Sequence, residues 1–167
     1  VGAKYKGVDI GSISDFTMFS FQAIKHITTG DGGMLIIKNK DLVDKAERIR
    51  WFGIDRKSKQ AGIWENDITE VGYKYQMTDI AAAMGLASLS EFDNQSKLRK
   101  ELYEAYESEL SSCDRLKIIG GSFSDREHAA WLFTVLVEDR YKLQQKLRDN
   151  GIESNQVHFR NDRYSIF

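Results

Sequence analysis

The chain alternates between two hydrophobic periods, and each period predicts a different kind of element. Short apolar runs at residues 16–21 and 34–37 predict two strands. Gly30, Gly32 and Gly33 lie between these runs, and glycine accepts the backbone conformations of a tight reversal. We therefore expect the chain to turn back sharply after a first, buried strand and to enter a second one.

Two further elements are expected in the first third of the chain. Alternating apolar and polar positions within residues 3–13 predict a hairpin or a bent extended segment. Asn39 or Asp41 can cap a helix that follows the second strand, and Gly53 is placed to end that helix. Residues 54–70 are mostly polar and irregular, which predicts a surface loop.

The middle of the chain predicts a helix that is apolar nearly all round, over residues 80–92. Thr78 can cap its start, because a threonine oxygen accepts a hydrogen bond from an N–H of the first turn. Small side chains within the helix would let another helix approach closely: Ala81, Ala82, Ala83, Gly85 and Ala87. A helix without a polar face needs cover on every side, so we expect sequence outside this chain or a partner subunit to cover it.

The second half of the chain predicts a separate small α/β unit. A charged helix is expected from Asn94 onward, and its apolar stripe consists of Leu98, Leu102, Ala105, Tyr106 and Leu110. After it we expect strands at residues 116–119 and 131–137, a helix capped by Asp139, and a returning strand at residues 152–157. The fold class is thus α/β, with one domain at residues 1–93 and another at residues 94–167.

Composition narrows the classes of function. The 167 residues carry 24 basic and 25 acidic side chains, mixed along the sequence, for a net charge of -1. No basic face is visible, so neither nucleic acid nor an anionic membrane is an expected partner. A single cysteine excludes an internal disulfide framework and fits the reducing cytoplasm. The chain starts at Val1 and contains no proline, and we expect it to be part of a longer polypeptide.

The candidate for chemistry is Lys25, a single amine at the end of the first apolar strand. A lysine in such a place can act as a Schiff-base nucleophile. The alternative is a solvated lysine beside a turn. The glycines that follow could suggest a phosphate-binding loop, but no helix begins at the spacing of such motifs.

Three blocks of sequence resemble one known family. The first runs Ser20-Phe21-Gln22, then Lys25, then Ile27-Thr28-Thr29-Gly30-Asp31-Gly32-Gly33. The second is Gly72-Tyr73-Lys74-Tyr75-Gln76-Met77-Thr78-Asp79-Ile80 with Ala82, Ala83, Gly85 and Leu86, and the third pairs Gly151-Ile152-Glu153 with Val157-His158-Phe159. Their order and spacing are similar to those of the DegT/DnrJ/EryC1/StrS sugar aminotransferases, which are pyridoxal-phosphate enzymes of fold type I.

This resemblance implies roles for residues of the first two blocks. Lys25 would bind the cofactor covalently and then move a proton, Ser20 would bind its phosphate, and Gln22 would belong to the same cofactor site. Lys74 stands where many relatives have an asparagine that reaches the phosphate of the neighbouring subunit. An exposed loop lysine is the alternative for Lys74, and Gln76 stands where those relatives have arginine.

In the third block, His158 would lie near the bound substrate, with a polar residue at a strand end as the alternative. Asn161, Asp162 and Tyr164 follow that block in a polar and aromatic cluster, which we expect to contact the sugar nucleotide. His26 is expected to pack or to form a hydrogen bond. Residues 1–93 would be the later part of the large cofactor-binding domain, and residues 94–167 a truncated small domain. The aspartate that pairs with the pyridine nitrogen would precede Val1, so we expect this chain alone to be inactive.

The implied reaction is transamination of a keto-sugar on a nucleoside diphosphate, with glutamate as amino donor, in a homodimer with shared active sites. Its products would enter surface polysaccharides or glycosylated metabolites. Relatives that dehydrate sugars have histidine in place of the lysine, so Lys25 favours transamination. A dehydratase or lyase of the same fold, and a non-catalytic regulatory homologue, stay open as alternatives.

Overall fold

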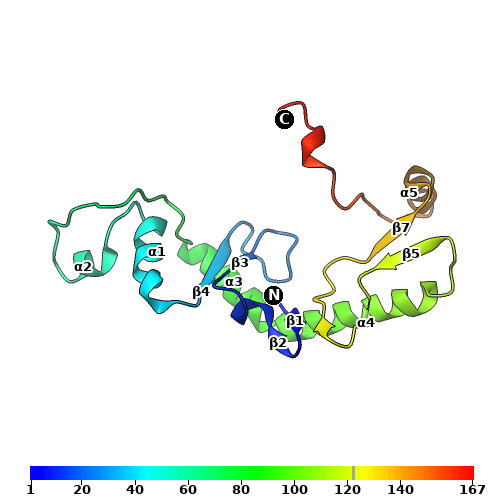
Figure 1. The fold of residues 1–167 in the computed structure, drawn as a ribbon, viewed down its shortest axis with the longest axis horizontal. Coiled ribbons are helices and arrows are strands. Elements are labelled where there is room, and N and C mark those ends of the chain that lie inside the picture. The colour runs from blue at the N-terminus through cyan, green and yellow to red at the C-terminus, as the bar shows by residue number, and fades with distance from the viewer. Residues whose placement is uncertain (122) are drawn as a thin grey trace.

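Short antiparallel sheets and five α-helices make up the computed structural model, which describes residues 1–121 and 123–167 (Figure 1). Three sheets are present within these ranges. Strand β1 (Lys4–Tyr5) lies between β2 (Val8–Asp9) and β6 (Arg126–Glu127), β3 (Phe16–Ser20) pairs with β4 (Gly33–Ile37), and β5 (Leu116–Ile119) pairs with β7 (Thr134–Val137). The mixed α/β composition agrees with the expected class.

The described ranges contain five α-helices. They are α1 (Val43–Arg50), α2 (Arg56–Gln60), α3 (Asp79–Ser90), α4 (Phe92–Leu110) and α5 (Arg140–Asp149). Only Glu91 separates α3 from α4, and the two follow one another through the centre of Figure 1. In Figure 1 the β3–β4 hairpin lies beside α3, α1 and α2 extend away from it to the left, and β5, β7 and α5 lie beside the far end of α4.

The two strands that flank the glycines form the expected hairpin. Phe16 pairs with Ile37 at one end of this hairpin, and Ser20 pairs with Gly33 at the other. This register places the segment between Ser20 and Gly33 at the connecting end of the hairpin. The first strand was expected to be buried, but it is largely uncovered in this chain: Met18 is 83% exposed.

Side-chain caps begin the helices at the expected places. Thr78 Oγ1 accepts a hydrogen bond from Ala81 N at 3.2 Å, and Asp139 Oδ1 accepts one from Lys142 N at 3.0 Å. Asn39 Oδ1 accepts from Asp41 N at 3.0 Å. Asn39 thereby caps a short 3₁₀ turn (Lys40–Leu42) that leads into α1.

Two expected elements are wrong. Residues 54–70 contain the helix α2 rather than loop alone, because Asp55 Oδ1 accepts from Ser58 N at 3.1 Å and starts a five-residue helix too short for periodicity to reveal. Residues 152–157 form no strand and leave α5 as an irregular segment. The small α/β unit is therefore a two-stranded sheet followed by a helix, not strand, helix, strand.

The expected apolar stripe of α4 is only partly covered within this chain, where Tyr106 stacks on Phe133 with ring centroids 5.1 Å apart. Leu98 and Leu102 are exposed, whereas Tyr103 is buried. The Tyr103 ring packs edge-on against Phe133, with centroids 5.0 Å apart, and its hydroxyl accepts from Gly121 N at 2.9 Å. Tyr103 and Tyr106 are therefore residues through which α4 packs on the segment leading into β7.

Residues 51–78, between α1 and α3, extend away from the rest of the chain, and we call them the excursion. Backbone pairing closes the base of this segment. The backbones of Trp51 and Lys74 form an antiparallel bridge there. Beside the bridge, Arg48 Nη2 and Nε donate to the Glu70 carboxylate at 3.0 and 3.2 Å. This hydrogen-bonded ion pair holds the pKa of Glu70 below its usual range.

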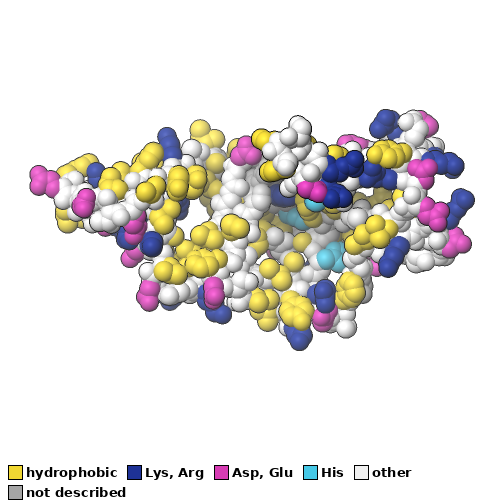
Figure 2. All heavy atoms as spheres, turned by 45° about the horizontal axis from the view of Figure 1, so that its top comes forward, with side chains coloured by type: hydrophobic (Ala, Val, Ile, Leu, Met, Phe, Trp, Pro, Cys, Tyr) yellow, Lys and Arg dark blue, Asp and Glu magenta, His cyan; other side chains and the backbone are white. Residues whose placement is uncertain are grey.

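The chain leaves far more surface accessible than a compact protein of its size. Its accessible area is 13361 Å² for a mass of 19.2 kDa, against about 8,400 Å² for a compact monomer, an excess of about 5,000 Å². Much of the excess is apolar: Ile80 on α3 is 77% exposed and Leu86 is 68% exposed. Figure 2 shows hydrophobic side chains over the left and centre, whereas charged ones crowd the right end. The apolar helix α3 is thus not covered by this chain, as expected.

Residues far apart in sequence meet in the β1 sheet. Lys4 pairs with Glu127, and Tyr5 pairs with Arg126. A strand from residues 1–93 therefore shares a sheet with one from residues 94–167, and the two expected domains are tied together here.

Within the described ranges, no helix has both the length and the apolar character needed to span a bilayer.

Replacing Thr78 by alanine is expected to lower the free energy of unfolding by about 1 kcal/mol, because the first turn of α3 loses its side-chain acceptor. Urea denaturation measures this change. Thr78→Ser keeps the hydroxyl and should retain most of the stability, and Thr69→Ala, in the exposed excursion, should have little effect. Equal stability of Thr78→Ala and wild type would contradict the assigned cap.

The Arg48–Glu70 pair predicts a pH dependence of unfolding. Because the pKa of Glu70 is lowered in the folded state, its stabilisation is present at neutral pH and is lost as the pH falls through the usual glutamate range and then the lowered value. Urea midpoints between pH 7 and pH 3 should therefore fall less steeply in Glu70→Gln than in wild type. Glu65→Gln, in the same excursion, should follow wild type, and an identical slope in Glu70→Gln would refute the pair's contribution.

Candidate functional site

Residues 21–32 form a closed loop at the end of the β3–β4 hairpin, and we call them the lysine loop. Phe21 N donates to Gly32 O at 2.9 Å, and Thr29 N donates to Phe21 O at 2.9 Å. Phe21, Ile27 and Thr29 are buried. The loop containing Lys25 is therefore fixed by its own backbone and anchored by three inward side chains.

Two threonines shape the far side of the lysine loop. Thr28 Oγ1 donates to Phe21 O at 3.2 Å and accepts from Gly30 N at 3.0 Å. Thr29 Oγ1 donates to Asp31 O at 2.8 Å. Gly30 has φ +79°, a conformation that side-chain-bearing residues rarely adopt. The glycines thus serve the reversal of the chain.

Helix α3 supports the lysine loop from one side. Ser88 Oγ accepts from Thr28 N at 3.2 Å. One turn earlier, a Cβ on Gly85 would lie 2.9 Å from Thr29 Cγ2, which is too close for a side chain. The small residue in α3 therefore lets the loop sit directly on the helix, and this contact joins the first two sequence blocks in space.

The segment between β6 and β7 supports the loop from a second side. His26 Nε2 donates to Ala129 O at 2.7 Å, and Trp131 Nε1 donates to Ile24 O at 3.0 Å. Burial lowers the pKa of His26, which favours the neutral ring that makes this bond. The prediction that His26 forms a hydrogen bond is confirmed.

Lys25 projects onto an aromatic ring. Its Nζ lies 3.3 Å from the centroid of the Trp131 ring, as a cation–π pair. Lys25 is half-buried, so its amine is held at a defined place and is not a freely solvated cation. The arrangement provides a primary amine in a fixed loop, which is what nucleophilic attack on a carbonyl carbon requires.

Ser20 and Gln22 lie immediately before Lys25. Ser20 Oγ accepts from Gln22 N at 3.3 Å, which leaves its hydroxyl proton for another acceptor. Gln22 Oε1 accepts from Ile24 N at 3.1 Å, and Lys25 N donates to Gln22 O at 2.9 Å. Gln22 therefore shapes the turn that presents Lys25, and its assignment to a cofactor site stays a prediction.

Lys74 lies apart from the lysine loop along the chain, at the base of the excursion, where its backbone pairs with Trp51. Its side chain is exposed and makes no ion pair with any described residue. No described contact joins Lys74 to Lys25. Its expected phosphate contact therefore stays a prediction.

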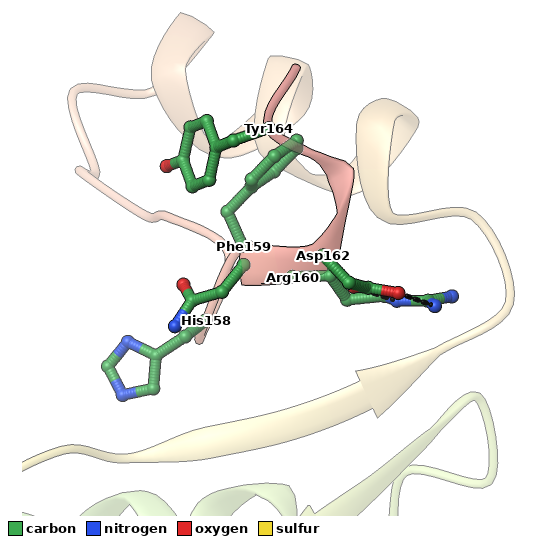
Figure 3. A pocket seen from close by; sticks show the side chains of 6 residues that line it. His158, Phe159, Arg160, Asp162 and Tyr164 are labelled. Atoms are coloured by element: carbon green, nitrogen blue, oxygen red, sulfur yellow. Dashed lines mark hydrogen bonds and ion pairs between the residues drawn. The ribbon is translucent and has the colours of Figure 1, made fainter. Parts of the chain in front are cut away.

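The residues expected to contact substrate cluster on the C-terminal segment. Figure 3 shows the rings of Phe159 and Tyr164 side by side, with centroids 5.2 Å apart, and Arg160 paired with Asp162. Arg160 lowers the pKa of Asp162, and Asn161 starts a short 3₁₀ turn (Asn161–Arg163). The His158 ring points away from these residues. No described contact joins this cluster to the lysine loop.

Sequence reasoning missed the residues that hold the lysine loop from outside. Trp131 was expected only as a strand residue, and it lies in the segment just before β7, outside the strand. Ser88 and Ala129 were not singled out at all. The Trp131 contact spans 107 residues, so no local spacing could indicate it.

Comparison with known proteins places this geometry in a family. The model of the DegT/DnrJ/EryC1/StrS aminotransferase family matches residues 1–165. GDP-perosamine synthase of Escherichia coli O157:H7 is 33% identical over 161 residues, which are 95% of this chain and 42% of that protein. The chain thus spans less than half the length of this relative.

Solved structures agree. The sugar aminotransferase CalS13 from Micromonospora echinospora superposes with a TM-score of 0.91 at 33% identity, over 99% of this chain and 44% of that one. Spr1654 from Streptococcus pneumoniae, whose solved forms include one with pyridoxal phosphate (PLP), superposes with a TM-score of 0.78 at 33% identity, over 92% and 40%. The resemblance suggested by the three sequence blocks is confirmed, and the chain belongs to the DegT/DnrJ/EryC1/StrS aminotransferase family.

Proposed function

We propose that this chain supplies the catalytic lysine of an enzyme that transfers an amino group, with glutamate as donor, to a keto-sugar carried on a nucleoside diphosphate. One observation carries the proposal: Lys25 presents its amine from a loop that α3 holds on one side and residues 129–131 on the other. A lysine that served only as a surface cation would need no such support.

The residues present fit part of PLP. When bound, PLP supplies a reactive carbonyl and a conjugated ring that accepts electrons from the substrate. Lys25 is the nucleophile that fits the carbonyl, and the Ser20 hydroxyl is a donor that fits a phosphate oxygen. Gln22 holds the turn between them, so that both groups leave the same end of β3.

Proton transfer in this reaction needs a base beside the reacting carbon, and the Lys25 amine is that base once it is free. The loop on which it sits is closed at Phe21 and rests on Gly85. A fixed backbone holds the root of the Lys25 side chain in place, and positioning of reactive groups is a large part of catalysis.

The rest of the site would come from outside this chain. The uncovered apolar faces of α3 and of the β3–β4 hairpin fit cover by further sequence of the same polypeptide and by a second copy in a homodimer. Lys74, exposed at the base of the excursion, would offer its ammonium to the cofactor phosphate of the second copy.

The C-terminal segment would contact the sugar nucleotide. His158, Asn161, Asp162 and Tyr164 offer a ring nitrogen, an amide, a carboxylate and a phenol, which are groups suited to sugar hydroxyls and phosphates. Asp162 is engaged with Arg160 in this structure. Substrate contact by the pair would use the remaining lone pairs of the carboxylate or the guanidinium of Arg160.

Borohydride reduction of the complete protein with PLP tests the role of Lys25. Reduction should leave the cofactor on the tryptic peptide that contains Lys25, and Lys25→Ala should abolish both this adduct and the visible absorbance of the bound cofactor. Lys38→Ala, at the end of the same hairpin, is the matched control and should retain both. An adduct on another lysine would refute the proposal.

The type of reaction is tested with the same protein and labelled glutamate. Transfer of the nitrogen label to the sugar product supports transamination. Loss of water from the sugar without nitrogen transfer would replace the proposal by a dehydratase. Absence of both, in protein with the Lys25 adduct, would indicate a non-catalytic homologue.

Charge reversal at Lys74 tests the phosphate role. Lys74→Glu would place a carboxylate near the phosphate of the second copy, and cofactor affinity should fall about tenfold, the equivalent of ~1.4 kcal/mol. Equilibrium dialysis of PLP measures this change. Lys38→Glu should leave the affinity unaltered, and an equal affinity for Lys74→Glu would show that Lys74 serves no phosphate.

A further inference from the structure

We propose that Trp131 is a positioning residue for Lys25: its ring holds the lysine side chain while the amine is protonated and free of cofactor. This inference rests on the proposed function only for its catalytic meaning. The contact itself is a property of this chain. No covalent step is involved, because the ring acts by electrostatic attraction alone.

Distance distinguishes this pair from the other cation–ring pairs. Lys25 Nζ lies 3.3 Å from the Trp131 ring centroid, well inside the limit of about 6 Å for such contacts. The other two tryptophans have cations at 5.1 Å (Arg56 on Trp51) and 5.7 Å (Lys59 on Trp64). Among the described cation–ring pairs, Lys25–Trp131 is the shortest.

A hydrogen bond fixes the orientation of the ring. Trp131 Nε1 donates to Ile24 O at 3.0 Å, and Ile24 is the residue next to Lys25. The indole therefore contacts the backbone on one side of the lysine through its N–H and the lysine amine through its π face. Two contacts from one rigid side chain define where the amine lies.

The backbone on either side of Trp131 is also held. Two residues earlier, Ala129 O accepts from His26 Nε2 at 2.7 Å. Upstream, β6 pairs with β1, and downstream β7 pairs with β5. Because the segment is fixed at both ends and in the middle, its backbone holds the attachment point of the ring, and the N–H bond to Ile24 O holds the ring itself.

The contact discriminates between the two states of the amine. A ring face attracts an ammonium group and gains little from the neutral amine. Trp131 therefore holds Lys25 while it carries a proton and releases it when the proton leaves. In the proposed reaction, this gives the lysine a defined resting position between the steps in which its nitrogen reacts.

Amine acetylation tests the contact in the complete protein after removal of the cofactor. The ring covers one side of the Lys25 amine, so loss of the ring should expose the amine to the reagent and speed its acetylation. With limiting acetic anhydride and quantification by mass spectrometry, Trp131→Leu should raise the rate at Lys25, relative to Lys38 in the same sample, about three- to tenfold. Trp131→Phe keeps an aromatic face and should give a smaller increase.

Matched controls separate positioning from general loosening. Trp64→Leu removes an exposed tryptophan that also faces a lysine, and it should leave the Lys25 rate unchanged. If Trp131→Leu raises the rate no more than Trp64→Leu does, or if Trp131→Phe and Trp131→Leu raise it equally, the π face does not hold the amine and the proposal is wrong.

A measurement on wild-type protein guards against a variant that fails to fold. Reductive methylation with ¹³C-formaldehyde keeps the charge of each lysine, and a dimethylammonium group above an indole face should resonate upfield of the other lysines. Lys25→Arg identifies the signal by its disappearance. A Lys25 signal among those of the exposed lysines would overturn the proposal, whether or not borohydride traps the cofactor on Lys25.

Discussion

The site depends on one carbonyl group. Phe21 O accepts from both Thr29 N and Thr28 Oγ1, and these two bonds draw the long connection of the hairpin into a closed loop. Closure presses Thr29 against α3, where only a residue without a side chain leaves room. A loop closed in this way can carry a lysine at a fixed position, whereas an open loop of the same length would let the amine sample a wide volume. Gly30, Thr28, Thr29 and Gly85 therefore all serve the closure of the lysine loop against α3.

Local chemistry accounts for what could be predicted from the sequence. The hairpin around the glycines, the cap at Thr78, the cap at Asp139 and the strand Leu116–Ile119 all follow from residues within a few positions of one another. The family also followed from local blocks, because each block is a contiguous stretch. The short helix α2 was missed because five residues carry too little periodicity, and the expected strand at residues 152–157 was assigned from apolar content without a strand to pair with.

Contacts between distant residues account for what could not be predicted. Lys25 could be selected as the reactive residue, but its neighbour Trp131 lies more than a hundred positions away, and nothing in the spacing connects them. The burial along α4 could not be predicted for a related reason. Leu98 and Leu102 have the period of an inward face and are exposed in this chain, whereas Tyr103 is covered because Phe133 and Gly121 lie beside it. Which apolar face is buried depends on the partner surface, and hydrophobic period alone does not specify the partner.

The pairing of β1 with β6 has a consequence for biosynthesis. The ribosome synthesises Tyr5 and the lysine loop long before Arg126 and Trp131. The contact between Trp131 and Ile24 alone spans 107 residues. Closing so long a segment costs entropy that the local hairpin does not incur. The hairpin can therefore form early, and the lysine must wait, without its aromatic cover, until nearly the whole of this chain has been translated. A nascent chain arrested before residue 126 would carry a folded hairpin and a lysine still open to solvent.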